Sequence, residues 1–271
     1  MHLSIRHETR YRYSGPVVLA LQRLRLGPPR GADIHVRSWN VVLEGAAEEA
    51  AFDDGHGNPN RLVSALPGSR EVLVRVEGEV QTLRDDGVVG PHAGPPLWLY
   101  GRQTPLTTVG EGVRSLADGF DPSDLLAALH ALTRRTRERI DYRIGATDAA
   151  TSAEDSIRLG AGVCQDHAHA FCAAARLNGV PARYVSGYLR MDDRDRQEAT
   201  HAWAEAHVDG IGWVGFDPAN GHSPDGRYVA IARGLDYRDA APVTGLVRGE
   251  RNEDLSVWLT VVERQQQQSQ Q

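Results

Sequence analysis

Lysine is absent from this chain of 271 residues, so all 30 of its basic side chains are arginine. Acidic residues outnumber them, and the formal net charge is -6 at pH 7. Non-specific affinity for nucleic acid depends on an excess of positive charge, so this balance argues against a nucleic-acid partner. Without lysine, the chain also has no side-chain amine to offer in reactions that consume amines.

Long hydrophobic runs and cysteine are scarce as well. No stretch of about 18 apolar residues occurs, which argues against a membrane-spanning helix. Residues 1–8 are polar and lack the apolar centre of a signal peptide, so we expect a cytoplasmic protein. The two cysteines, Cys164 and Cys172, would lie about 12 Å apart on one helix, which is too far for a disulfide.

Hydrophobic periodicity divides the chain into three parts and predicts an α+β fold. Residues 1–95 alternate and end in a segment rich in proline and glycine, which predicts a β-rich domain. Residues 96–263 show helical spacing and then alternation, and the glutamine-rich residues 264–271 are expected to be disordered. Predicted strands cover 3–13, 34–43, 61–66, 71–83, 182–191, 200–208, 213–217 and 255–262, predicted helices 123–140 and 164–178, and a predicted turn 53–59.

A cysteine opens the second predicted helix. Cys164 follows Gly162 and precedes the polar residues Gln165 and Asp166, a setting that suits a cleft better than a core. Unpaired N–H groups and the helix dipole stabilise a thiolate in the first turn of a helix. Cys164 is therefore a candidate nucleophile, with a small buried hydrophobe as the alternative, whereas Cys172 lies in an apolar stretch and is predicted to be a core residue.

His201 and Asp217 are the candidate base and orienting acid for this cysteine. They lie at the start of one predicted strand and at the end of the next. Side chains alternate along a strand, so His201 and Asp217 can share a face only under one condition. The numbers of any two residues that pair across the strands must add up to an even number. A two-residue turn would pair Val208 with Ile211 and separate them, so we predict a three- or five-residue loop or a bulge.

Several histidines raise the alternative of a zinc site. Cys164 and His167 are three residues apart on the predicted helix, and His169, His207 and His222 are further candidate ligands. No paired-cysteine spacing accompanies them, so we expect no metal and no cofactor. His167 and His169 are predicted to line the cleft or to lie at the surface.

Four blocks of the sequence, followed by a segment near the C-terminus, resemble the bacterial transglutaminase-like family. The blocks are residues 162–166, 179–188, 201–205 and 212–221. Residues 11–13, 24–28 and 54–58 are similar to the β-rich N-terminal region of that family, and residues 234–243 to the segment after its core. Leu235 stands where the family pattern has arginine, which leaves the role of that side chain open.

The resemblance implies a papain-like core whose cysteine-bearing helix packs on an antiparallel sheet. Cys164, His201 and Asp217 match the family's catalytic residues, which implies acyl transfer from a peptide or protein amide through a thioester, to water or to an amine. The Cys164 backbone N–H is expected in the oxyanion hole, with Gln165 or Trp203 as a second group. A non-catalytic peptide-binding module and a metal hydrolase are the alternatives.

Overall fold

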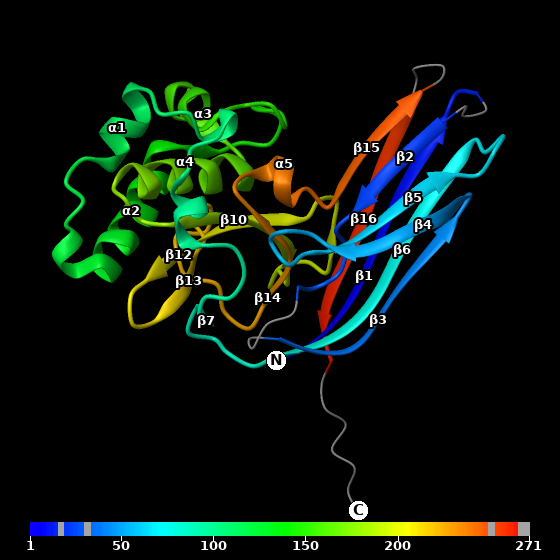
Figure 1. Ribbon diagram of the computed structural model, residues 1–271, viewed down its shortest axis with the longest axis horizontal. Helices are drawn as coiled ribbons and strands as arrows, with labels where there is room; N and C mark the ends of the chain where they lie inside the picture. Colours follow the sequence, from blue (N-terminus) through cyan, green and yellow to red (C-terminus); the bar gives the residue numbers. More distant parts are fainter. Residues whose placement is uncertain (16–18, 30–33, 249–252, 265–271) are drawn as a thin grey trace, which may run out of the picture.

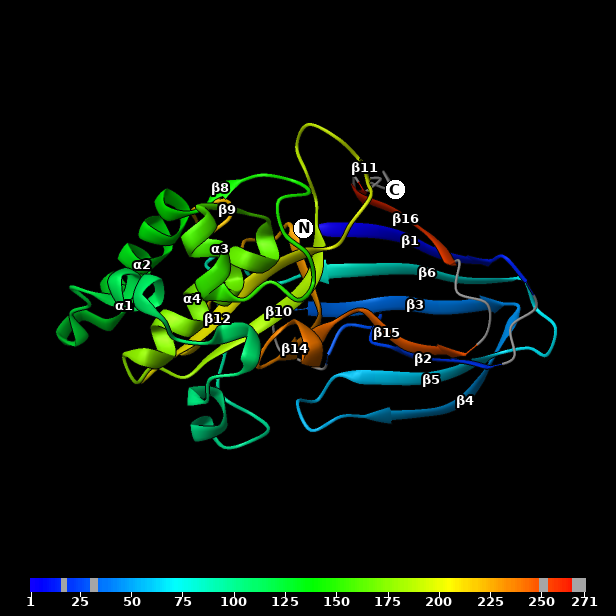
Figure 2. The same cartoon turned by 90° about the horizontal axis from the view of Figure 1, so that it is seen from above.

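The computed structural model describes residues 1–15, 19–29, 34–248 and 253–264. A β-sandwich and a unit in which helices cover a sheet lie next to each other (Figures 1 and 2), so the predicted α+β fold is confirmed. The predicted strands and helices are all present, with ends displaced by at most two residues. The prediction for residues 265–271 lies outside the described residues.

Alternating side chains build the sandwich. In β1, every second residue from Leu3 to Tyr13 is buried and faces the second sheet, as the sequence pattern predicts. One sheet contains, in spatial order, β11 (Arg196–Gln197), β16 (Glu253–Glu263), β1 (His2–Tyr13), β6 (Glu71–Thr82) and β3 (Ile34–Glu44), and the other contains β15 (Val243–Arg248), β2 (Leu19–Leu24), β5 (Pro59–Ala65) and β4 (Ala46–Asp53).

The last two strands of the chain pair within the sandwich. β16 pairs antiparallel with β1, and β15 pairs antiparallel with β2. The division predicted from the sequence groups residues 243–263 with the second unit, whereas their pairing puts them in the N-terminal sheets. The chain therefore leaves the sandwich, forms the second unit and returns.

The second unit is built on a five-stranded sheet. It contains β14 (Tyr228–Gly234), β10 (Ala182–Leu189), β12 (His201–Val208), β13 (Gly212–Phe216) and β7 (Val88–Gly90), and a separate pair joins β8 (Asp141–Tyr142) to β9 (Ala161–Gly162). The helices are α1 (Glu111–Ala117), α2 (Leu125–Arg139), α3 (Ala153–Leu159), α4 (Cys164–Leu177) and α5 (Tyr237–Ala240), with 3₁₀ turns at Leu97–Gly101, Pro105–Thr107 and Pro122–Asp124. None of these helices is long and apolar enough to cross a membrane.

Helix α4 is the central helix of this unit. Its alanines are buried against Ala204 and Ala206 of β12, and α1, α2 and α3 surround its other sides. Small side chains on both elements let the helix approach the sheet closely. Cys172 is fully buried here, and both cysteines of α4 are free thiols. The helix therefore presents its first residue at a fixed position above the sheet.

The two parts of the molecule share buried contacts. Tyr188, Val229 and Ile231 of the second sheet belong to the same apolar cluster as the interior of the sandwich. The predicted turn at residues 53–59 is present, and it also docks on β14. Its Asn58 side chain donates a 2.7 Å hydrogen bond to the carbonyl of Arg233 and accepts one of 2.7 Å from the Arg233 N–H.

Candidate active site

Cys164 is the first residue of α4. The residue before it, Val163, is extended, and its N–H donates a 2.7 Å hydrogen bond to Oδ2 of Asp166 in the first turn of the helix. The same oxygen accepts a 2.6 Å hydrogen bond from the Thr147 hydroxyl. Burial raises the pKa of Asp166, and these hydrogen bonds oppose that shift. The contacts fix the backbone that carries the partly exposed thiol.

Gly162 allows the turn before the helix. A Cβ atom at this position would lie 2.7 Å from both Cβ and Oδ2 of Asp166, closer than non-bonded atoms approach. The absence of a side chain therefore lets the Asp166 carboxylate reach the N–H of Val163. Glycine is needed at this position because a larger side chain would overlap Asp166.

The β12–β13 hairpin brings His201 and Asp217 together. Val208 pairs with Gly212, so a three-residue loop joins the strands, as the parity argument predicts. With this register the two side chains share a face, and His201 Nε2 lies 2.6 Å from Asp217 Oδ2. The predicted pair of side chains is therefore in contact.

Asp217 has two further partners that sequence reasoning missed. Its Oδ2 accepts hydrogen bonds from Asn220 Nδ2 at 2.7 Å and from the Tyr228 hydroxyl at 2.8 Å, and its Oδ1 accepts one from the Asn220 N–H at 3.1 Å. Asn220 lies three residues after Asp217, a spacing typical of turns closed by an aspartate. Nothing in the sequence links Tyr228 to this carboxylate, because it arrives from another strand.

The charges of this pair stabilise each other. Burial alone would lower the pKa of His201, but the Asp217 charge and hydrogen bond, together with Cys164, raise it to about 10. Burial alone would raise the pKa of Asp217, but His201, Tyr228 and Asn220 lower it to about 2. An imidazolium beside a carboxylate is therefore the favoured state at neutral pH.

Cys164 and His201 line the same cleft. Because Nε2 faces Asp217, Nδ1 is the ring nitrogen left for the thiol, and the neighbouring Cys164 contributes to the raised pKa of His201. A thiol, an imidazole and a buried carboxylate are thus brought to one site, the set of groups that an activated thiol requires.

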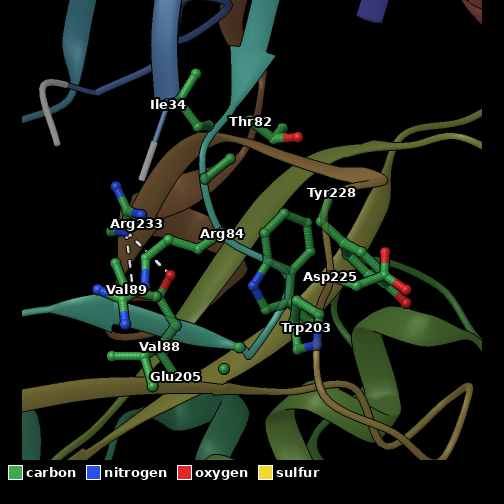
Figure 3. A pocket seen from close by; sticks show the side chains of 14 residues that line it. Ile34, Thr82, Arg84, Val88, Val89, Trp203, Glu205, Asp225, Tyr228 and Arg233 are labelled. Atoms are coloured by element: carbon green, nitrogen blue, oxygen red, sulfur yellow. Dashed lines mark hydrogen bonds and ion pairs between the residues drawn. The ribbon is translucent and has the colours of Figure 1, made fainter. Parts of the chain in front are cut away.

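Trp203 supports the imidazole from behind. It is 3% exposed, and its ring lies nearly parallel to that of His201, with centroids 6.2 Å apart. Figure 3 shows its indole between the Glu205–Arg233 pair and Tyr228, beside a cavity of about 50 Å³. This burial favours a positioning role for Trp203 over contact with substrate.

A cleft of about 970 Å³ opens over Cys164 and His201. Gln165 lines it next to the cysteine, as expected of a residue near the reacting group. Its other lining residues are Tyr142, Ile144, Val163, Tyr184, Ser186, Ala202 and Tyr237, together with Met191, Arg194 and residues 196–200.

The prediction for His167 and His169 is wrong, because both are buried. His167 places Nδ1 2.8 Å from the Val163 carbonyl and Nε2 2.8 Å from the Ile140 carbonyl, and His169 Nε2 accepts a hydrogen bond from the Tyr237 N–H. Helix α4 is enclosed on all sides, so these side chains find backbone partners instead of water. Among the described residues, no three metal-ligating side chains gather in one place.

Sequence comparisons agree with this geometry. The model of the transglutaminase-like superfamily matches residues 114–218, which include the three candidate residues, and the model of the bacterial transglutaminase-like N-terminal region matches residues 3–81. An uncharacterized protein of Mycobacterium tuberculosis is 30% identical over 271 aligned positions, covering 90% of this chain and 86% of the relative. The chain belongs to the transglutaminase-like superfamily, as its motifs predict.

Two further similarities complete the comparison. An uncharacterized protein of Mycobacterium leprae is 34% identical over 180 residues, covering 64% of this chain and 60% of the relative. The crystal structure of a presumed cysteine protease from Cytophaga hutchinsonii is 20% identical with a TM-score of 0.77, covering 97% of this chain and 90% of that chain. This structural likeness extends over both parts of the fold.

Proposed function

We propose that this protein catalyses acyl transfer from peptide or protein amides through a thioester on Cys164. The observation that carries the proposal is that Cys164 and His201 line one cleft, with His201 Nε2 2.6 Å from Oδ2 of the buried Asp217. A thiol, a base and a carboxylate that orients the base form the general arrangement of nucleophilic catalysis by cysteine.

The proposed reaction begins with the thiol proton on His201. The Cys164 thiolate attacks the amide carbon and forms a C–S bond, and the carbonyl electrons move to oxygen. The tetrahedral intermediate then collapses, the C–N bond breaks, and His201 gives its proton to the leaving amine. Asp217 holds the ring tautomer and stays ionised throughout, in keeping with its pKa of about 2.

We propose that the backbone N–H of Cys164 stabilises the oxyanion. It belongs to the first turn of α4, where N–H groups have no partner within the helix, and the helix dipole favours negative charge there. The side chain of Gln165 lines the same cleft and is the proposed second donor. Trp203 is proposed to keep the His201 ring in place.

We propose water as the acceptor that releases the acyl group. Water needs no subsite of its own, and His201 can take its proton as it attacks the thioester. The products are then a carboxylic acid and free Cys164, which makes the protein a peptidase or amidase. Transfer to an amine is the other outcome of the same intermediate.

The test uses a peptide mixture prepared from casein, with and without an added biotinylated amine. Wild-type protein should generate new peptide ends or deamidated glutamines detectable by mass spectrometry, and Cys164→Ala and His201→Ala should generate none. Biotin incorporation would assign amine transfer instead. Cys172→Ala is the matched control, because that cysteine is fully buried away from the cleft. Products that persist in Cys164→Ala would refute the proposal.

A further inference from the structure

The wall of the cleft opposite Gln165 is a loop that the sandwich holds in place. This loop, residues 190–200, is called the flap here. It leaves β10, reaches the sandwich edge at β11 and returns to β12, as Figure 2 shows. Its cleft-lining side chains are Met191, Arg194, Arg196, Gln197, Glu198, Ala199 and Thr200.

Backbone pairing fixes the middle of the flap. Arg196 and Gln197 pair with Thr260 and Leu259 of β16. The Gln197 side chain also donates a 2.8 Å hydrogen bond to the carbonyl of Leu189 at the end of β10. The flap is therefore held at both the sandwich and the sheet, so the residues that line the cleft are carried on a backbone that is fixed at two places.

Arg196 is held by an aromatic ring on the sandwich. Its guanidinium carbon lies 3.5 Å from the ring centroid of Trp258 on β16. Stacking engages the flat face of a guanidinium and leaves the N–H groups at its edge for other partners. In the described part of the chain, no carboxylate pairs with these N–H groups.

The neighbouring charged side chains pair with other residues and not with Arg196. Arg194, the other cationic residue of this wall, pairs with Asp193 at 2.7 Å. Glu8, which lies opposite Trp258 on β1, is already bound by Arg75 at 2.9 Å and by Arg6 at 3.2 Å.

One acidic side chain shares the wall with Arg196. Glu198 also lines the cleft, and among the described residues it makes no ion pair with Arg196. Arg196 lines the cleft and is exposed, so the edge of its stacked guanidinium is open to solvent, with donors spaced for a carboxylate.

We propose that Arg196 binds a carboxylate of the substrate, so that the cleft selects acidic peptides. The inference rests on the proposed function, since it assigns a specificity residue to that same cleft. Trp258 is the positioning residue, because it holds the guanidinium plane without touching the substrate. The sandwich thereby takes part in recognition through β16.

The experiment measures binding separately from chemistry. Cys164→Ala protein is offered a library of synthetic peptides, each made in a glutamate and a glutamine version, and the bound peptides are counted by mass spectrometry. Glutamate versions should be enriched about tenfold or more at low salt, the value expected for a hydrogen-bonded ion pair. Raising the salt should reduce the enrichment, since the site is open to solvent.

Variants on the same background identify the residue. Arg196→Gln should remove the enrichment, and Arg196→Lys should keep part of it because the charge remains. Trp258→Ala should weaken it and Trp258→Phe should restore most of it, a rescue that a merely structural role would not show. Arg194→Gln is the matched control and should leave the preference nearly unchanged, because Asp193 already neutralises that side chain.

The inference and the proposed function fail separately. Equal binding of both peptide versions, or an enrichment that survives Arg196→Gln, would overturn the role of Arg196 whatever the chemistry. In another outcome, Cys164→Ala selects acidic peptides but the wild-type protein yields no products. That result would overturn the proposed function and leave the role of Arg196 in binding intact.

Discussion

Replacing Asp217 by asparagine tests the charge balance around His201. The substitution keeps the shape of the side chain but removes its negative charge. Asp217 Oδ2 accepts hydrogen bonds from three donors, at 2.6 Å from His201, 2.7 Å from Asn220 and 2.8 Å from Tyr228. An amide oxygen at that place can still accept these three bonds, whereas the NH2 group that replaces Oδ1 loses the 3.1 Å bond from the Asn220 N–H, so the variant should fold with a lower stability.

The expected effect is a large fall in the pKa of His201. Burial lowers this pKa, and Asp217 is the first of the groups that raise it to about 10 from the ordinary 6.5. Without the carboxylate the value should drop to about 6.5 or below, because only Cys164 still opposes burial. A fall of the pKa from about 10 to 6.5 corresponds to about 5 kcal/mol of lost preference for the imidazolium.

The assay is an NMR titration of the imidazole nitrogens. In wild-type protein, His201 should stay protonated from about pH 6 to about pH 9 and lose its proton only as the pH rises further. In Asp217→Asn it should lose the proton below about pH 7. Asp225→Asn is the control, because that carboxylate pairs with Arg227 and not with His201. An unchanged His201 titration in Asp217→Asn would refute the reasoning.

Three further substitutions probe the supports of the site. Tyr228→Phe removes one hydrogen bond to the buried Asp217 carboxylate and should lower the free energy of unfolding by about 1.5–3 kcal/mol in a urea titration, with the activity partly retained. Gly162→Ala should lower it by about 1–3 kcal/mol and reduce the activity, because its methyl group overlaps the first turn of α4, whereas Gly101→Ala, which meets open space, should change neither. Arg176→Gln should lower the melting temperature markedly, since the guanidinium donates four hydrogen bonds to acceptors on three other segments. Stability equal to wild type in either the Tyr228 or the Arg176 variant would contradict these assignments.

Local patterns were enough to predict eight strands and two α-helices of the described residues, including β1 and α4. Alternation in β1 and helical spacing in α4 are properties of neighbouring residues, so they can be read without knowing the fold. The parity argument went further, because a hairpin links two nearby strands. It predicted a three- or five-residue loop or a bulge if His201 and Asp217 share a face, and the Val208–Gly212 pairing shows the three-residue loop.

Long-range placement could not be read from these patterns. β15 and β16 pair with strands more than two hundred residues earlier, and alternation does not say which partner a strand takes. For the same reason no sequence pattern indicates that Tyr228 binds Asp217 or that Trp258 stacks on Arg196.

Burial of polar residues was the other property that sequence patterns concealed. The sequence predicts that His167 and His169 line the cleft or lie at the surface, yet both are buried within the enclosed part of helix α4. Their partners are backbone groups of Val163, Ile140 and Tyr237, which no side-chain pattern identifies. Composition is therefore a poor guide to the burial of polar residues on a helix that is covered on every side.

The most direct test of an activated nucleophile compares the two cysteines within one molecule. Cys164 lies in the cleft beside His201, whereas Cys172 is fully buried, and burial raises the pKa of its thiol to about 11. Iodoacetamide labelling is followed by mass spectrometry from about pH 5 upwards, below the range near pH 8.5 where free cysteine ionises. We predict fast labelling of Cys164 at about pH 6, none of Cys172, and a strong loss of the Cys164 reaction in His201→Ala. Labelling of Cys164 that appears only near pH 8.5, or that is unaffected by His201→Ala, would contradict the account.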